Sequence, residues 1–117
     1  MFMNIRFTKY FQKQVKKIAK SFPSVESDLE DGFCGFFEDH SVVNLGKNIF
    51  KLRVRNSDLH CGKSGGYRLI VYFSSKKKVL LPLLLFSKRK KQNVSFDLIE
   101  KSLEMVIAEI EANKTHE

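Results

Sequence analysis

The sequence predicts an α+β domain in which three helices pack against an antiparallel or mixed four-stranded sheet, in the order β-α-α-β-β-β-α. Apolar residues recur at helical spacing in two runs before residue 40 and in a third after residue 95. Between them, strict alternation over residues 49–55 and two apolar runs joined by a short polar link indicate strands. The chain has 117 residues, and we expect residues 1–117 to form one domain.

The first predicted strand leads into a lysine-rich helix. Residues 1–7 alternate between apolar and polar side chains, which is the pattern of a short strand. Thr8 can cap a helix over residues 9–20, in which the apolar positions share one face and five lysines lie outside it. The lysine face could contact RNA, although a solvated helix face is the commoner meaning of such a pattern.

A second helix is predicted after Pro23, which ends the first one. Ser24 and the acids behind it suit a helix start, and a stripe of apolar and aromatic side chains continues to about residue 39. A phenylalanine stripe at this spacing indicates core rather than a binding surface. Gly32 and Gly35 either weaken the helix or mark close packing against the sheet.

Three strands follow a polar segment, residues 40–48, that is predicted to be a loop. The strands cover residues 49–56, 67–74 and 78–86, and the short link between the last two favours antiparallel neighbours. The last strand is apolar from residue 79 onward, as expected of a strand covered on both faces. Pro82 cannot donate a hydrogen bond, so we expect a bulge or an unpaired edge there.

The last predicted element is a helix that follows a basic loop, KRKK at residues 88–91. Ser95 caps this helix, and Asp97 and Glu100 suit its positive end. Its apolar face comprises Phe96, Ile99, Leu103, Val106, Ile107 and Ile110.

Charge is distributed unevenly along the chain. Residues 47–91 contain thirteen Lys or Arg and one acid, whereas residues 21–46 contain six acids and no Lys or Arg. The net charge is +8, and its separation creates a positive field that attracts polyanions. Scattered charge that keeps a basic protein soluble is the alternative, but the segregation favours nucleic acid or an acidic partner.

The composition favours a soluble, cytoplasmic protein. Cys34 and Cys61 are too few for a disulfide framework and too far apart for a CxxC site, so a reducing compartment is expected. No signal-peptide pattern opens the chain, and the longest apolar run, residues 79–86, is far shorter than the roughly 20 residues of a membrane span.

A lysine-bearing glycine turn lies at the centre of the predicted site. The segment CGKSGGYRLIVYF, residues 61–73, runs from this turn into an apolar strand, and its glycines let a ligand approach the main chain. Alternation over residues 49–55 puts apolar side chains on one strand face and cations on the other. Those strand cations are either a solvated face or, if the two strands pair, part of a cationic site that includes Lys51, Arg53, Arg55, Lys63 and Arg68.

Three segments occur here in a characteristic order and spacing: KLR at residues 51–53, GKSGGYRLIVYF at 62–73 and FSKRKK at 86–91. Together they resemble the RelE/HigB-like toxins of the RelE/ParE superfamily, and the resemblance covers nearly the whole chain. GKSGGYR before an apolar strand is its most specific part. The resemblance implies a compact toxin of a type II toxin–antitoxin system, encoded with a cognate antitoxin, that cleaves mRNA in the ribosomal A site.

Residue by residue, the resemblance implies a cationic catalytic site. Lys51 and Arg53 fall where such toxins place basic catalytic groups on a strand. Arg68 matches the arginine that contacts the scissile phosphate, and Arg89, next to Lys88, matches the basic position after the last strand.

RNA cleavage without a metal needs a base for the 2′-hydroxyl, stabilisation of the phosphorane charge and an acid for the leaving oxygen. We expect Lys51 to act as the base and Arg53 with Arg68 to stabilise the charge. Lys88 or Arg89 would assist the leaving group, and like-charge crowding would lower a lysine's pKa toward the working pH. RNA contacts are expected from Arg55, Lys63, Lys90 and Lys91.

No cofactor or metal is expected, because His40, His60 and His116 have no ligand-like spacing. Members of the family often carry tyrosines where Phe86 and Ser95 stand here, so neither position offers a phenol to relay a proton. A site without acids, imidazoles or metal is consistent with completion by the ribosome. Cleavage of free RNA is therefore expected to be weak or absent.

The nearest alternative is a DNA gyrase poison of the ParE type, which shares the fold without cleaving RNA. A non-catalytic RNA-binding protein or degenerate toxin and a purely structural basic domain are further alternatives. In the toxin reading, an acidic segment of the antitoxin is expected to cover the basic face.

Overall fold

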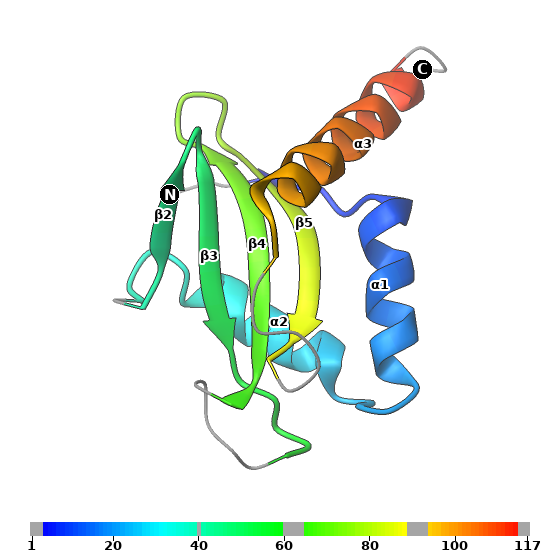
Figure 1. The fold of residues 1–117 in the computed structure, drawn as a ribbon, viewed down its shortest axis with the longest axis vertical. Coiled ribbons are helices and arrows are strands. Elements are labelled where there is room, and N and C mark those ends of the chain that lie inside the picture. Colours follow the sequence, from blue (N-terminus) through cyan, green and yellow to red (C-terminus); the bar gives the residue numbers. More distant parts are fainter. Residues whose placement is uncertain (1–3, 40, 60–64, 89–93, 115–117) are drawn as a thin grey trace.

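A five-stranded mixed sheet carries the three helices of the chain (Figure 1). The computed structural model describes residues 4–39, 41–59, 65–88 and 94–114. Its elements are β1 (Asn4–Ile5), α1 (Lys9–Ala19), α2 (Val25–Cys34), β2 (Val43–Gly46), β3 (Ile49–Val54), β4 (Tyr67–Ser74), β5 (Val79–Ser87) and α3 (Phe96–Lys114). The strand order is β1-β5-β4-β3-β2, with β1 parallel to β5 and the other neighbours antiparallel.

The predicted α+β class and the order of the helices are confirmed, but the predicted number of four strands is wrong. The additional strand is β2, which lies in the segment predicted to be a loop. Gly46, Lys47 and Asn48 take φ angles of 89°, 54° and 65°, and this left-handed turn folds β2 back onto β3. The side-chain oxygen of Asn44 accepts a hydrogen bond from the Gly46 amide at 2.8 Å and supports the turn.

Each face of the sheet has its own hydrophobic core. On the face covered by α1 and α2, here called the α2 face, Leu52, Tyr67 and Leu69 pack with Phe11 and Leu29. The opposite face, here called the α3 face, packs against α3; its core includes Ile49, Ile70, Leu84, Ile99 and Val106. In Figure 1, α3 crosses only one end of this face, and no helix lies over its other end.

The interruption predicted at Pro82 is confirmed as a shift in register. Ile70 is opposite Leu84, whereas the next residue, Val71, is opposite Pro82. On the other side of β5, Gln14 of α1 takes the place of a neighbouring strand. Its amide nitrogen donates to the Leu83 carbonyl at 3.0 Å, and its amide oxygen accepts from the Leu85 amide at 3.1 Å.

The predicted helix caps at Thr8 and Ser95 are confirmed. The Thr8 hydroxyl accepts a hydrogen bond from the Phe11 amide, and the Ser95 hydroxyl accepts one from the Leu98 amide, both at 3.2 Å. The helix start predicted at Ser24 is also confirmed, since Ser24 directly precedes α2 and its carbonyl accepts a hydrogen bond from the Asp28 amide at 3.0 Å, although its side chain makes no cap hydrogen bond.

The second helix ends at Cys34 rather than at residue 39. Gly35 follows it, and Phe36 and Phe37 lie in turns beyond the helix end. Close packing accounts for Gly32, since a Cβ at this position would lie 3.1 Å from Cγ2 of Val54.

Glu109 of α3 holds the start of α1. Its carboxylate accepts hydrogen bonds from the Lys9 amide at 2.6 Å and the Tyr10 amide at 3.1 Å, at the positive end of the α1 dipole. The Tyr10 hydroxyl also hydrogen-bonds the hydroxyl of Ser102 at 2.7 Å.

Among the described residues, no helix has the length and apolar character needed to cross a membrane.

Candidate functional site

Three of the predicted catalytic cations share the α3 face of the sheet. Arg53 of β3 lies directly opposite Arg68 of β4 in the antiparallel register. Lys51 is two residues before Arg53 in the same strand, so its side chain leaves from the same face. Directly opposed residues have Cα atoms about 4.5–5.5 Å apart, and the two arginines are therefore immediate neighbours.

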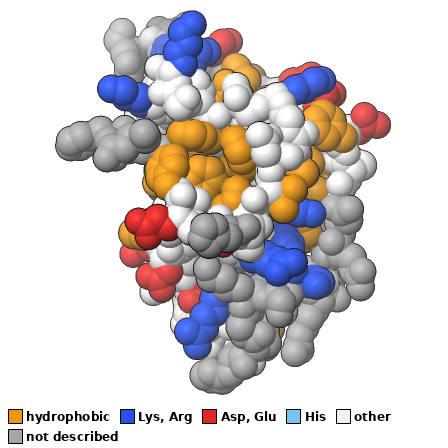
Figure 2. Space-filling model, turned by 90° about the vertical axis from the view of Figure 1, so that its left-hand side faces the viewer, with side chains coloured by type: hydrophobic (Ala, Val, Ile, Leu, Met, Phe, Trp, Pro, Cys, Tyr) orange, Lys and Arg blue, Asp and Glu red, His pale blue; other side chains and the backbone are white. Residues whose placement is uncertain are grey.

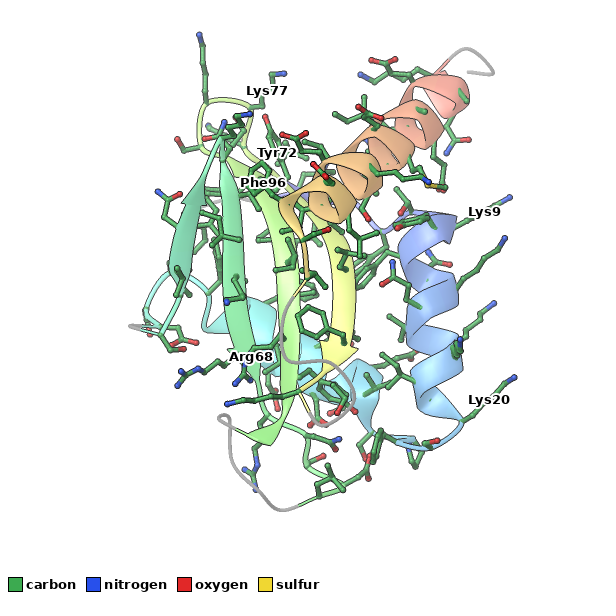
Figure 3. The ribbon with its side chains drawn as sticks, viewed as in Figure 1. Lys9, Lys20, Arg68, Tyr72, Lys77 and Phe96 are labelled. Carbon is green, nitrogen blue, oxygen red and sulfur yellow. The ribbon has the colours of Figure 1, made fainter. Side chains whose placement is uncertain are left out.

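An aromatic residue extends this row onto the third strand. Arg68 lies opposite Phe86 of β5, so Arg53, Arg68 and Phe86 form one line across three adjacent strands. Here this line is called the cation row, with Lys51 included. Figure 3 shows Arg68 near the end of the sheet that α3 leaves uncovered. Sequence reasoning noted Phe86 only as a missing tyrosine, because its place beside Arg68 depends on strand register.

Arg68 is held in a largely enclosed position. Its side chain and backbone together are only 6% exposed, and its Nη1 donates a hydrogen bond to the carbonyl of Tyr67 at 3.2 Å. Burial, followed by the like charge of Arg53, lowers the pKa of Arg68 below its ordinary value. The fold thus holds two positive charges together, and an anion placed between them would relieve the repulsion.

Of the remaining predicted cations, two lie in the described part of the chain and four lie outside it. Lys88 is exposed and follows β5, and its backbone amide donates to the Gly66 carbonyl at 3.1 Å, two residues before Arg68. Arg55 is also exposed and follows β3 directly. The predictions for Arg89, Lys63, Lys90 and Lys91 lie outside the described residues.

Two aspartates fix the loop that leaves β3. Asp28, on the buried side of α2, accepts hydrogen bonds from the Ser57 amide at 3.0 Å and hydroxyl at 3.1 Å. Asp58 accepts from the Ser24 amide at 3.0 Å and hydroxyl at 3.1 Å. Sequence reasoning missed the role of Asp28. The signal was available, because Asp28 falls between Val25 and Leu29 in the apolar stripe of α2.

None of the three tyrosines stands in the cation row. Tyr10 bonds Ser102, and Tyr72 lies opposite Ile49 at the other end of the sheet. Tyr67 belongs to the core of the α2 face, where its hydroxyl is buried without a hydrogen-bond partner among the described residues. Burial, and then the charges of two nearby aspartates, raise the pKa of Tyr67. Its phenol is therefore neutral and is separated from Arg68 by the sheet.

Carboxylates border the cation row on one side. A cleft of about 140 Å³ brings Arg53 and Arg55 beside Asp28, Asp31 and Asp39. These acids of α2 and the segment after it compete with any bound anion for the two arginines. Arg68, two strands from the edge of the sheet, does not line this cleft.

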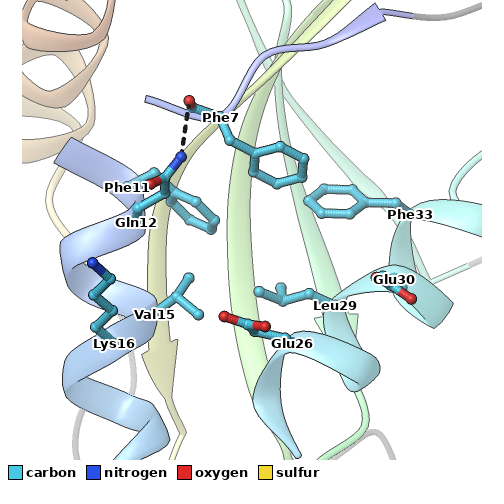
Figure 4. Close-up of a pocket in the computed structure, with 9 residues that line it drawn as sticks. All are labelled: Phe7, Phe11, Gln12, Val15, Lys16, Glu26, Leu29, Glu30 and Phe33. Carbon is cyan, nitrogen blue, oxygen red and sulfur yellow. Dashed lines mark hydrogen bonds between the residues drawn. The ribbon is translucent and has the colours of Figure 1, made fainter. Parts of the chain in front are cut away.

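A larger hollow lies away from the cations, between α1 and α2 (Figure 4). It measures about 280 Å³. Phe7, Phe11, Leu29 and Phe33 give it an apolar floor, while Lys16 and two glutamates line its rim. Lys9 at the start of α1 and Lys20 directly after its end are likewise separate from the cation row, since both point away from the sheet in Figure 3.

Within the described part of the chain, no group of three or more His, Cys, Asp or Glu residues could hold a metal ion. The positions of His40, His60 and His116 lie outside that part.

No protein-family model, curated protein or solved structure matches the chain. The fold and the site define the class of the protein as an α+β domain with paired arginines on a sheet face that α3 crosses at only one end.

Proposed function

We propose that this protein is the toxin of a type II toxin–antitoxin system and acts as a metal-independent, ribosome-dependent mRNA endoribonuclease that inhibits translation. The observation that carries the proposal is the cross-strand pair of Arg53 and Arg68. Like charges directly opposite each other in a sheet are destabilising. Such a pair, with Arg68 enclosed, is better explained by the binding of an anion than by the needs of the fold.

A backbone phosphate of RNA is the anion that suits this geometry. Two adjacent guanidinium groups can each donate two hydrogen bonds to phosphate oxygens, and they stabilise the extra charge of the phosphorane more than the charge of the ground state. Phe86, next to Arg68 in the row, offers a ring face on which a neighbouring base can stack. The row therefore provides contacts for both the phosphate and the base of a nucleotide.

The proton transfers are assigned to basic side chains of the site. In the proposed reaction Lys51 removes the 2′-hydroxyl proton, the 2′-oxygen attacks the phosphorus, and the bond to the 5′-oxygen breaks to give a 2′,3′-cyclic phosphate and a 5′-hydroxyl. Lys88, whose backbone is fixed beside Gly66, or Arg89 protonates the leaving oxygen. Without a tyrosine in the row, this chemistry relies on the ribosome to orient the mRNA.

The test is cleavage of a translated message. The chain is induced in a bacterium, and mRNA 5′ ends are mapped for the unchanged protein, Arg68→Ala, Arg53→Ala and the control Lys20→Ala. We expect cuts within translated codons that fall by about 100-fold or more in both arginine variants, as for the loss of one charge-stabilising group. Lys20→Ala removes the same charge from the exposed position that directly follows α1 and should cleave as well as the unchanged protein.

The choice of two arginine variants separates loss of activity from loss of folding. Arg53 is exposed, so Arg53→Ala should fold even where loss of the enclosed Arg68 disturbs the sheet. Intact message together with double-strand DNA breaks would show a gyrase poison instead. Cleavage that persists in folded Arg53→Ala and Arg68→Ala would remove these arginines from the mechanism, and absence of growth arrest would reject the toxin assignment.

A further inference from the structure

The two edges of the sheet differ in how they are closed. At one edge β1 is only two residues long, and beyond it Gln14 of α1 occupies the hydrogen-bonding groups of Leu83 and Leu85. At the other edge β2 has a single strand neighbour, β3. In an edge strand every second residue directs its N–H and C=O away from the sheet, where another strand can pair with them.

Apolar side chains flank the β2 edge on the α2 face. Phe37 is 55% exposed, and its ring centroid lies 5.0 Å from that of Phe36 and 5.3 Å from that of Phe73. Phe50 of β3, opposite Asn44, joins the same cluster through Phe36 and Phe73. Figure 2, which looks onto this side of the molecule, shows hydrophobic side chains gathered in its middle.

Cations flank the same edge on the α3 face. Val43 of β2, itself 46% exposed, lies opposite Lys51. The pairing of β2 ends at this position, so Arg53 stands beyond it with an exposed side chain. At the other end of β2, the side chain of Lys47 is 75% exposed and forms an ion pair with Glu100 at 3.4 Å. At this edge the α2 face therefore suits apolar side chains of a partner, and the α3 face suits acidic ones.

We propose that the β2 edge binds an extended segment of a partner protein in which apolar and acidic residues alternate. The segment adds a sixth strand beside β2. Its apolar side chains pack near Phe37 on the α2 face, and its acidic side chains lie toward Lys51 and Arg53 on the α3 face. Because successive side chains of a strand point to opposite faces, one alternating sequence satisfies both flanks.

Charge selects this occupant over the other candidates. A second copy of the chain carries a net charge of +8 and would bring further cations to an edge at which Lys51 and Arg53 already lie. On the α2 face, Glu38 and Asp39 directly follow Phe37, so acidic residues of a partner are disfavoured there. A glutamate on the α3 face can reach a lysine two strands away, about 9.5 Å between Cα atoms, across the short side chain of Val43.

The inference does not require the proposed RNA cleavage, although it uses two of the same cations, Lys51 and Arg53, because binding of a strand at the β2 edge can be measured without any cleavage. It is tested with the full chain and three labelled twelve-residue peptides. The first alternates valine and glutamate, the second alternates valine and lysine, and the third repeats the first with every backbone nitrogen methylated. Affinity is measured by fluorescence anisotropy, and the bound region is located from backbone amide NMR shifts.

We expect the valine–glutamate peptide to bind at least about tenfold more tightly than either other peptide, with shifts centred on Val43–Gly46. Val43→Glu should weaken this binding by about tenfold or more, since the new carboxylate would repel the glutamates of the peptide on the α3 face. Met105→Glu is the matched control, because Met105 has the same 46% exposure on α3, and it should bind within about twofold of the unchanged chain.

Several results would overturn the inference. Absence of saturable binding at millimolar peptide rejects it, as does equal affinity for the methylated peptide, since the latter cannot pair as a strand. Equal binding by Val43→Glu, or shifts centred on α1 and α2, places the contact elsewhere. A dimer of the unliganded chain that is lost in Val43→Glu would identify a second copy as the occupant of the edge.

Discussion

Gly66→Ala should weaken the fold and the site together, although it adds only one methyl group. Gly66 directly precedes β4, where the chain passes the end of β3. A Cβ at this position would lie 2.8 Å from the amide nitrogen of Asn56 and in still closer contact with the carbonyl oxygen of Val54. Both obstacles are backbone atoms, so no side-chain rotation can make room, and the two strands must separate.

The magnitude follows from two opposing effects. Overpacking of this kind costs about 1–3 kcal/mol, and rigid backbone obstacles favour the upper end. The alanine also restricts the unfolded chain, which offsets about 0.4–1 kcal/mol. The net loss is about 2 kcal/mol. With an unfolding entropy of about 0.25 kcal/mol per kelvin for 117 residues, Tm should fall by about 8 °C.

Thermal unfolding of three glycine variants measures this effect against internal controls. A Cβ at Gly35 would meet only the Asp31 carbonyl, at an ordinary 3.7 Å, so Gly35→Ala should change Tm by no more than about 2 °C. At Gly32 the obstacle is the Val54 side chain at 3.1 Å, which can adjust, and Gly32→Ala should fall between the other two. The expected order of stability is Gly35→Ala, then Gly32→Ala, then Gly66→Ala.

The activity of the same variants provides a second readout. Separation of β3 and β4 at Gly66 moves Arg68 relative to Arg53, so Gly66→Ala should lose mRNA cleavage at temperatures where it is still folded. An unchanged Tm for Gly66→Ala would refute the close backbone approach. A lowered Tm with full cleavage would instead show that activity does not depend on the alignment of the two arginines.

Three further substitutions test the packing around the sheet by chemical or thermal denaturation. Gln14→Met leaves the Leu83 carbonyl and the Leu85 amide without their partner and should cost about 1–3 kcal/mol, whereas a neutral result would mean that water replaces the amide. Glu109→Gln removes a negative charge from the start of α1 and should lower stability by about 0.5–1 kcal/mol, an effect that disappears in high salt if the reasoning is correct. Arg53→Gln should raise stability by about 0.5 kcal/mol while it abolishes cleavage, and a loss of stability would contradict a repulsive pair.

The elements whose pattern is complete within a short window could be predicted from the sequence. The alternation before residue 56 placed β3, and the apolar runs on either side of a polar link placed β4 and β5. The missed strand, β2, has four residues and a mixed pattern, and it forms because a left-handed turn at Gly46, Lys47 and Asn48 returns it to β3. The parallel pairing of β1 with β5 joins residues more than 70 positions apart and leaves no local signal.

The candidate site was predictable to a similar extent. Alternation alone put Lys51 and Arg53 on one face, but their alignment with Arg68 and Phe86 depends on two strand registers. The hydrogen bonds by which Asp28 fixes the loop after β3 were missed because this buried acid was interpreted as part of the acidic start of a helix.

The side-chain amide of Gln14 has a consequence for assembly in concentrated solution. A sheet that can accept strands at both edges can in principle grow without limit, as fibrils do. Here, among the described residues, one end is sealed by Gln14 and a two-residue strand, and the other is open. Edge-to-edge association must therefore stop once two open edges have met, and it yields a closed pair rather than a filament.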